Sequence, residues 1–286
     1  MPVFALVMIL GSALMHATWN LFSKRSGGGL TFVWLMNSVS ALLLLPLGLW
    51  AFGNSGKHFV VGGILVALAS AALHSAYNLL LQRAYRSGDL SLVYPLARGT
   101  GPLLSSALAM VFFAERPSLL AWLGIIAIVA GGLAVSMRRD FFRAGFDRRA
   151  IYYGVATGGM IAAYTLTDKA GVSSLAVPPA LYYLSVILAE ELMLAPLALR
   201  RGGLAQEWRA NRTAILVVGV LSPLSYLLIL FAFSFEPVSY VAPVREVSIL
   251  IAVVLGGHFL REGAGVGRIA GACAMIAGIA TITLAR

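Results

Sequence analysis

The chain has 286 residues, of which 60% are hydrophobic and 11% are charged, and its mean hydropathy is +0.90. This composition excludes a soluble globular domain and indicates a membrane protein. The net charge of +10 fits basic cytoplasmic loops better than a nucleic-acid surface, and the single cysteine, Cys273, excludes an intrachain disulfide.

Ten apolar segments follow one another along the chain, each close to the roughly 20 residues that cross a hydrocarbon core as a helix. The first lacks a basic leader, so it is predicted to be a retained span rather than a signal peptide. Short connections leave no room for a soluble domain. The predicted fold is an all-α integral membrane protein of ten transmembrane helices. Their approximate limits are 2–23, 31–52, 60–85, 90–113, 118–137, 150–170, 177–199, 212–234, 238–260 and 265–284.

The basic loop 138–149 divides the chain into two predicted repeats of five spans, 1–137 and 150–286. The segment SLVYP at 91–95 aligns with SYVAP at 239–243, an offset of 148 residues. One Glu and two Gly residues also recur: Glu115, Gly124 and Gly131 match Glu262, Gly271 and Gly278. Repeats with an odd number of spans point in opposite directions across the membrane. Such inverted repeats are typical of transporters that work by alternating access around a central cavity.

Basic residues are unevenly distributed between the two sides of the predicted membrane. Of the 21 Lys and Arg residues, fifteen follow odd-numbered spans and four follow even-numbered spans. The positive-inside rule therefore predicts cytoplasmic odd-numbered loops and periplasmic positions for both termini.

Two spans carry polar and aromatic residues at helical spacing, so that each group shares one face, and two spans of the second half carry partial counterparts. These residues are His16, Trp19 and Asn20 in span 1, His74, Tyr77 and Asn78 in span 3, Tyr164, Thr165 and Asp168 in span 6, and Ser225 and Tyr226 in span 8. Interhelical hydrogen bonding is one interpretation. Because aromatic partners recur on all four spans, we favour the walls of a cavity for a small organic molecule.

Arg98 lies inside span 4, and its equivalent in the second repeat is Glu246, which follows Arg245 in span 9. Ionisable residues inside spans are costly and are therefore functional candidates. Two hypotheses fit: an ion pair that packs the halves together, or a guanidinium that binds a cargo carboxylate and is oriented by Glu246. Tyr94 shares a face with Arg98 and is a further candidate cargo residue.

The sequence RGTGP at 98–102 predicts a kink or break in span 4. Pro102 removes a backbone hydrogen bond, and interrupted helices expose backbone groups to transporter cavities. Close helix packing is the alternative explanation for the glycines. The candidate gating residues are Pro95, Gly99, Gly101, Pro102 and Pro243.

Further carboxylates lie in or beside the spans. Glu190 and Glu191 interrupt span 7, either as proton-coupling groups or as groups that pair with an arginine or lie near an interface. Glu115 and Glu262 precede spans 5 and 10, where we expect them to complement positive helix N-termini.

Several function classes lack their motifs. There is no Walker lysine loop or HExxH motif and no Cys/His cluster for a structural metal, so neither a cofactor nor a metal is expected. His74 would be a candidate base in an intramembrane enzyme, but no serine or cysteine motif accompanies it. The loop arginines lack the aromatic interleaving of a nucleic-acid surface. The predicted partners are a small-molecule cargo and the lipid bilayer, and not nucleic acid.

The two five-span halves, the Glu and Gly-rich final span of each half, and the stretch VYPLARGTGPLLSSALAMVFFAERPSLLAWLG at 93–124 resemble the drug/metabolite transporter superfamily, in its EamA-like family. The resemblance covers essentially the whole chain and is nearest to the bacterial branch that exports aromatic and other amino acids. It implies a central cavity bounded largely by spans 1, 3, 4, 6, 8 and 9. It also implies termini in the cytoplasm, opposite to the charge distribution.

The sequence thus predicts a secondary transporter of the bacterial inner membrane that exports amino acids or related small metabolites. Sugar phosphates, nucleotide sugars and cationic drugs are alternative cargoes. A non-transporting scaffold would not need a polar midplane. Because the two halves are fused, one chain can complete a pathway as a monomer.

Overall fold

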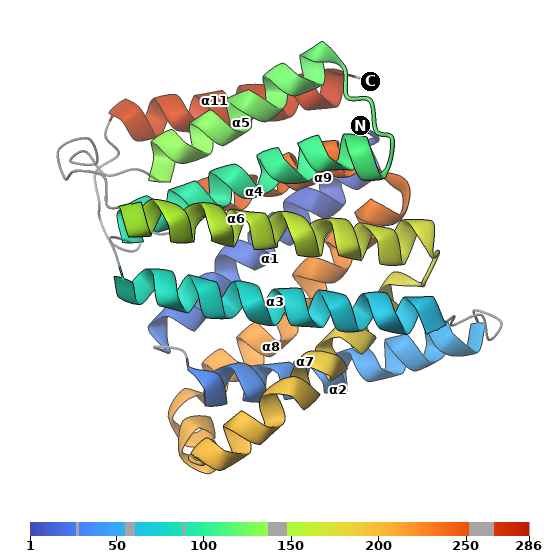
Figure 1. The fold of residues 1–286 in the computed structure, drawn as a ribbon, viewed down its shortest axis with the longest axis vertical. Helices are drawn as coiled ribbons and strands as arrows, with labels where there is room; N and C mark the ends of the chain where they lie inside the picture. The colour runs from blue at the N-terminus through green and yellow to red at the C-terminus, as the bar shows by residue number, and fades with distance from the viewer. Residues whose placement is uncertain (27–28, 55–60, 88–89, 137–147, 252–265, 286) are drawn as a thin grey trace. The chain divides into compact units, whose positions relative to one another are not determined.

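The computed structural model describes residues 1–26, 29–54, 61–87, 90–136, 148–251 and 266–285, and the regular elements in these ranges are helices (Figure 1). They are α1 (Val3–Arg25), α2 (Leu30–Asn54), α3 (Val61–Ser87), α4 (Leu90–Phe112), α5 (Leu119–Ser136), α6 (Arg148–Lys169), the π-helix η1 (Ala170–Ser174), α7 (Pro179–Arg201), α8 (Leu204–Phe235), α9 (Val238–Arg245) and α11 (Val266–Leu284).

Seven of the described helices are long and apolar enough to cross a membrane, against ten predicted spans. The other three predicted spans correspond to α4, α6 and α9. α6 carries four charged residues, and α9 ends after eight residues. The amino group of Met1 donates a hydrogen bond to the carbonyl of Thr283 at 3.0 Å. The N-terminal residue and the last turn of α11 therefore lie together.

The helix that carries predicted span 8 is longer than the span itself. Asn211 has non-helical torsion angles (φ −125°, ψ 18°) and divides α8. The part after this residue, 212–235, coincides with the predicted limits of 212–234. The preceding turns hold Glu207, whose carboxylate accepts a hydrogen bond from the Asn211 amide at 2.7 Å, so a polar contact stabilises the bend.

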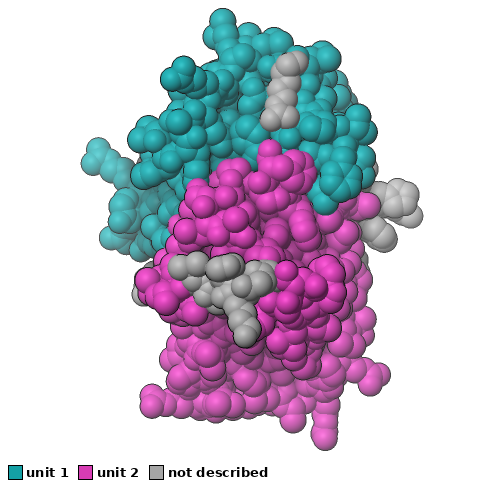
Figure 2. Space-filling view, turned by 90° about the vertical axis from the view of Figure 1, so that its right-hand side faces the viewer, with its two compact units in different colours: residues 1–10, 73–166, 236–286 teal, residues 11–72, 167–235 magenta. Residues whose placement is uncertain are grey.

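The chain forms two compact units, each assembled from several stretches of sequence (Figure 2). Unit 1 contains residues 1–10, 73–166 and 236–286, and unit 2 contains residues 11–72 and 167–235. Unit 1 thus combines α4 and α5 with α9 and α11, whereas unit 2 combines α2 with α7 and α8. Each unit takes helices from both sequence repeats, and the units do not coincide with them.

Helices α5 and α11 make the most extensive helix contact among the described residues of unit 1 (Figure 1). A Cβ atom on Gly131 would lie 2.5 Å from the carbonyl oxygen of Gly271, and one on Gly124 would lie 2.8 Å from that of Gly278. The glycines therefore permit an approach that a larger residue would block. The pairs run antiparallel: Gly131 meets the repeat equivalent of Gly124, and Gly124 meets the repeat equivalent of Gly131, as in a contact related by a two-fold axis.

Helix α4 is continuous from Leu90 to Phe112, so the break predicted around Pro102 is not found there. The interruption lies in the second repeat instead, where α9 ends at Arg245 and a new helical turn begins at Val247. The amide of Glu246 donates to the carbonyl of Pro243 at 3.0 Å, and the amide of Ile249 donates to the carbonyl of Glu246 at 2.9 Å. These tight turns place Glu246 at a helix junction.

Glu115 stabilises a different helix from the one expected. Its carboxylate accepts hydrogen bonds from the backbone amides of Val238 and Ser239 at 2.7 and 3.0 Å, and from the Ser239 hydroxyl at 2.6 Å. It thus caps the positive N-terminus of α9, and not that of α5. Its repeat equivalent, Glu262, lies outside the described residues.

In unit 2, α2 packs against both α7 and α8. The Ser40 hydroxyl donates to the carbonyl of Gly219 at 2.8 Å. The two carboxylates of predicted span 7 face α2, because Asn37 donates to Glu190 at 3.3 Å and Ser38 donates to Glu191 at 2.5 Å. Polar side chains of α2 therefore donate a hydrogen bond to each of the two glutamates of α7.

Candidate functional site

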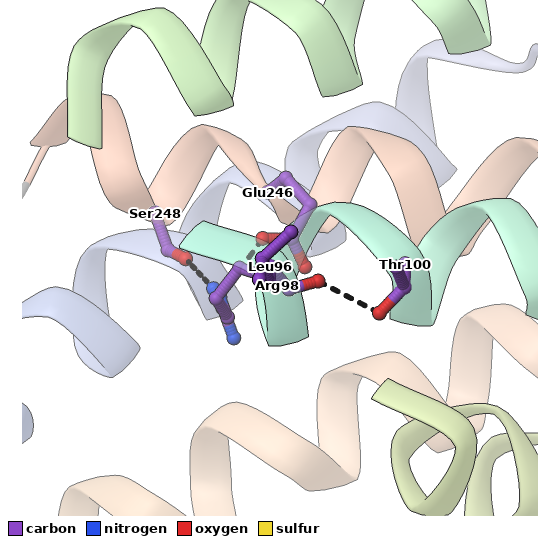
Figure 3. Close-up of polar contacts among 5 residues, drawn as sticks. All are labelled: Leu96, Arg98, Thr100, Glu246 and Ser248. Carbon is purple, nitrogen blue, oxygen red and sulfur yellow. Dashed lines mark hydrogen bonds and ion pairs between the residues drawn. The ribbon is translucent and has the colours of Figure 1, made fainter. Parts of the chain in front are cut away.

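Arg98 of α4 forms an ion pair with Glu246 at the end of α9 (Figure 3). Arg98 Nε lies 2.9 Å from Glu246 Oε2, and Arg98 Nη2 donates a hydrogen bond to Ser248 Oγ at 2.9 Å. The Nε contact has the distance of a hydrogen bond but not its alignment, so we treat it as an ion pair. We call Arg98, Glu246 and Ser248 the Arg98 centre.

The Arg98 centre joins equivalent positions of the two repeats, since Glu246 follows Arg98 by the repeat offset of 148 residues. A residue that contacts its own equivalent lies close to the axis that relates the repeats. The adjoining cavity measures about 10 Å³, room for about one water molecule. This cavity is too small to hold a cargo carboxylate. Arg245, the neighbouring candidate, is partly buried.

Three aromatic candidates from predicted spans 3 and 6 meet in unit 1. The ring of His74 stacks on Tyr164 with 4.1 Å between centroids, and Tyr77 approaches Tyr164 edge to face at 5.8 Å. Tyr164 is buried and the other two rings are partly buried. We call these three residues the α3–α6 aromatic cluster. Asn78, on the same helix, is exposed.

The candidates of span 1 are used differently. The rings of His16 and Trp19 meet edge to face at 4.9 Å, but the Asn20 amide donates to the His16 carbonyl of its own helix at 2.8 Å. Trp19 packs against the apolar cluster of Phe32, Ile215 and Val218. In this structure, Trp19 is part of the packing of unit 2.

The two candidates of span 8 have separate partners. Ser225 is buried, and its hydroxyl donates to the carbonyl of Ser12 at 3.0 Å. The hydroxyl of Tyr226 donates to Asp168 at the end of α6. Ser225 thus joins α8 to α1, and Tyr226 joins α8 to α6.

Asp168 is the centre of the second polar group. Its side chain is 0% exposed and accepts hydrogen bonds from Ser70, Tyr226 and, at 2.8 Å, Tyr182. These hydroxyls come from α3, α8 and α7. We call Ser70, Asp168, Tyr182 and Tyr226 the Asp168 centre. The next residue, Lys169, is also buried, and its ammonium donates to the carbonyl of Phe233 at 2.6 Å.

The backbone beside Asp168 is irregular. α6 ends at Lys169 and continues as the π-helix η1, in which the amide of Leu175 donates to the carbonyl of Ala170 at 2.9 Å. A Cβ atom on Gly171 would lie 2.2 Å from Cε2 of Tyr182, so only glycine lets this ring reach the carboxylate. π-helical turns often occur at functional sites.

The candidate gating residues lie at helix contacts in unit 1 where their surroundings are described. Gly99 faces Leu133 and Val129 of α5, and Gly101 faces Ile161 of α6. The remaining described members, Pro102 and Pro243, are both buried. The side chains of Tyr94 and Pro95 lie outside the described residues.

Comparison with known proteins assigns the family. The model of the EamA-like transporter family matches residues 3–137 and again residues 148–284. The chain belongs to the EamA-like transporter family. A solved chain described only as "Crystal structure of protein" is similar in fold, with a TM-score of 0.80, 14% identity, and coverage of 99% of this chain and 98% of the other. No curated protein matches the sequence.

This EamA-like transporter is therefore a multi-pass membrane protein with two repeats. Two residues that bind Asp168, Ser70 and Tyr182, were not predicted as site residues. Asp168 itself was placed on a polar face but not singled out, although acidic residues in spans are candidates by rule. The hydroxyl groups that bury it come from helices distant in sequence.

Proposed function

We propose that this transporter exports amino acids or related small metabolites across the bacterial inner membrane by alternating access between its two repeats. The observation that supports this cargo class is the α3–α6 aromatic cluster. It combines a phenol–imidazole stack at 4.1 Å with a second phenol; Tyr164 is buried, and His74 and Tyr77 are partly buried. Such a group suits a small organic molecule with an apolar or aromatic side chain.

The direct test is flux through the purified protein in proteoliposomes. Each of the twenty amino acids is supplied in labelled form, and we expect saturable uptake and exchange of at least one. Folded protein that moves none of the twenty would overturn the amino-acid proposal. Flux of a cationic drug or a sugar phosphate in the same vesicles would then reassign the cargo.

The role of the α3–α6 aromatic cluster is tested with Tyr164→Ala. Loss of the stacked ring is expected to raise the half-saturating cargo concentration about tenfold, equivalent to roughly 1.4 kcal/mol. Tyr152→Ala is the matched control, because Tyr152 lies on the same helix and is 68% exposed. Equal effects of the two substitutions would show that the α3–α6 aromatic cluster does not contact the cargo.

We also propose cytoplasmic odd-numbered loops and periplasmic termini, on the basis of the basic residues. The hydrogen bond between Met1 and Thr283 supports the same side for both ends. A reporter enzyme that works only in the periplasm should be active when it is fused after Arg286. Activity of a cytoplasm-only reporter at that position would reverse the orientation.

A further inference from the structure

The Asp168 centre carries an inference about energy coupling that rests on the proposed transport function. A carboxylate in a membrane span is expensive to keep, yet three helices direct a hydroxyl to this one. Gly171 and the π-helix η1 make room for one of them. The arrangement is thus built around a single buried carboxylate.

The chemistry of the partners makes this carboxylate sensitive to protonation. An ionised carboxylate only accepts hydrogen bonds, whereas a protonated one must also donate. Ser70, Tyr182 and Tyr226 all donate to Asp168, and any of these hydroxyls can turn and accept when a proton binds. Protonation therefore rearranges the contacts of α6 with α3, α7 or α8.

The groups around Asp168 define what else can titrate there. Tyr182 faces it from α7, Tyr226 from α8, and Lys169 follows it along the chain. Ser70, from α3, does not titrate. The ring of Tyr183 packs on Tyr226 with 5.1 Å between centroids, so a movement of Tyr226 is passed directly to α7.

We propose that Asp168 is the proton-binding site that couples cargo export to the proton gradient. A proton can reach this side chain, which is 0% exposed, by transfer along the hydroxyl groups that are hydrogen-bonded to it. The carboxylate takes up one proton from water on one side of the membrane and releases it on the other side. Only the O–H bond of the carboxyl forms and breaks, and no other reactant is needed.

The test separates coupled transport from cargo binding. Proteoliposomes receive the labelled amino acids under an imposed pH gradient, and internal pH is followed with a trapped dye. Wild type is expected to accumulate cargo against its gradient with counter-movement of protons. Accumulation by Asp168→Asn should be at least tenfold lower than by wild type. The exchange of internal for external cargo should be retained.

Several outcomes overturn the proposal. One is gradient-driven accumulation by Asp168→Asn that equals that of the wild type. Another is wild-type flux that does not depend on the pH gradient. The amino-acid proposal survives that second result, so the two failures are distinguishable. Accumulation that is driven by a sodium gradient at constant pH would indicate that the Asp168 carboxylate binds sodium and not a proton.

Glu191→Gln provides the rival comparison. Glu191 is a less buried carboxylate of unit 2 than Asp168. It lies partly buried on α7 and accepts a hydrogen bond from Ser38. We expect this variant to retain gradient-driven accumulation. Loss in Glu191→Gln with retention in Asp168→Asn would place the coupling site on α7 instead.

Two further measurements hold if Asp168→Asn does not fold, and the second of them also holds if no amino acid is moved. Tyr226→Phe keeps the carboxylate but removes a donor to its charged form, so the pH of half-maximal flux should rise. Infrared difference spectra should show one titrating carboxyl band in the wild type without cargo. Absence of this band across the physiological pH range would overturn the proposal independently of flux.

Discussion

The Arg98 centre of unit 1 and the Asp168 centre of unit 2 both bury a carboxylate, but they compensate it in different ways. Glu246 faces a guanidinium at 2.9 Å, whereas Asp168 accepts hydrogen bonds from three hydroxyl groups. A guanidinium keeps its charge at any accessible pH. Hydroxyl groups are neutral and can turn from donor to acceptor.

We propose that this difference separates a structural role of the Arg98 centre from a switching role of the Asp168 centre. The Arg98 pair lies where the two repeats meet at equivalent positions and where α9 is interrupted. Its fixed charges hold that junction. The Asp168 centre joins helices at unrelated positions of the repeats, and its hydrogen bonds depend on the proton content of one carboxyl group.

Removing one partner of the Arg98 pair should have the largest effect on stability. Glu246→Ala leaves the partly buried guanidinium without its carboxylate, at a cost of about 3–5 kcal/mol. Equilibrium unfolding of the detergent-solubilised protein measures this loss. The double variant Arg98→Met/Glu246→Met removes both charges and should recover most of it. A loss in the double variant equal to the sum of the losses in Arg98→Met and Glu246→Met alone would show that the two residues are not energetically coupled.

Displacing Tyr182 should damage the Asp168 centre to a smaller extent. Gly171→Ala puts a Cβ atom against the Tyr182 ring, and such overpacking costs about 1–3 kcal/mol. The matched control is Gly159→Ala on α6, where no other group lies within 4 Å. The control should be neutral or stabilising by up to about 1 kcal/mol. Unfolding curves that coincide for the two variants would contradict the tight contact.

Effects no larger than that of Gly171→Ala distinguish the two centres by pH. Ser70→Ala and Ser248→Ala each remove one hydroxyl from a charged group, at a cost of about 1.5–3 kcal/mol at most. Ser70 stabilises an ionised carboxylate, so the cost of Ser70→Ala should be present at high pH and fall as Asp168 takes up a proton. The cost of Ser248→Ala should not vary, because the arginine stays charged. Unfolding measured over a pH series tests the contrast, and a parallel pH dependence of the two variants would abolish it.

Much of the candidate site could be predicted, but its grouping could not. Helical spacing placed His74 and Tyr77 on one face, and Tyr164 does meet them. The same spacing grouped Asn20 with His16 and Trp19, yet Asn20 bonds to its own backbone. Spacing describes one helix only, and the neighbour that a face meets depends on packing between distant segments.

The sequence by itself determined the membrane class, the two repeats and the equivalence of Arg98 with Glu246, because hydropathy and repeat offsets are properties of the linear chain. Only the tertiary structure decided that these equivalent residues touch, and that each unit mixes helices from both repeats. It also decided that α4 stays continuous through Pro102 while α9 is interrupted at Glu246. A proline removes one backbone hydrogen bond, and neighbouring helices determine whether the rest of the helix persists. The Asp168 centre exists for the same reason: its four residues come from four helices, and packing alone brings them to one carboxylate.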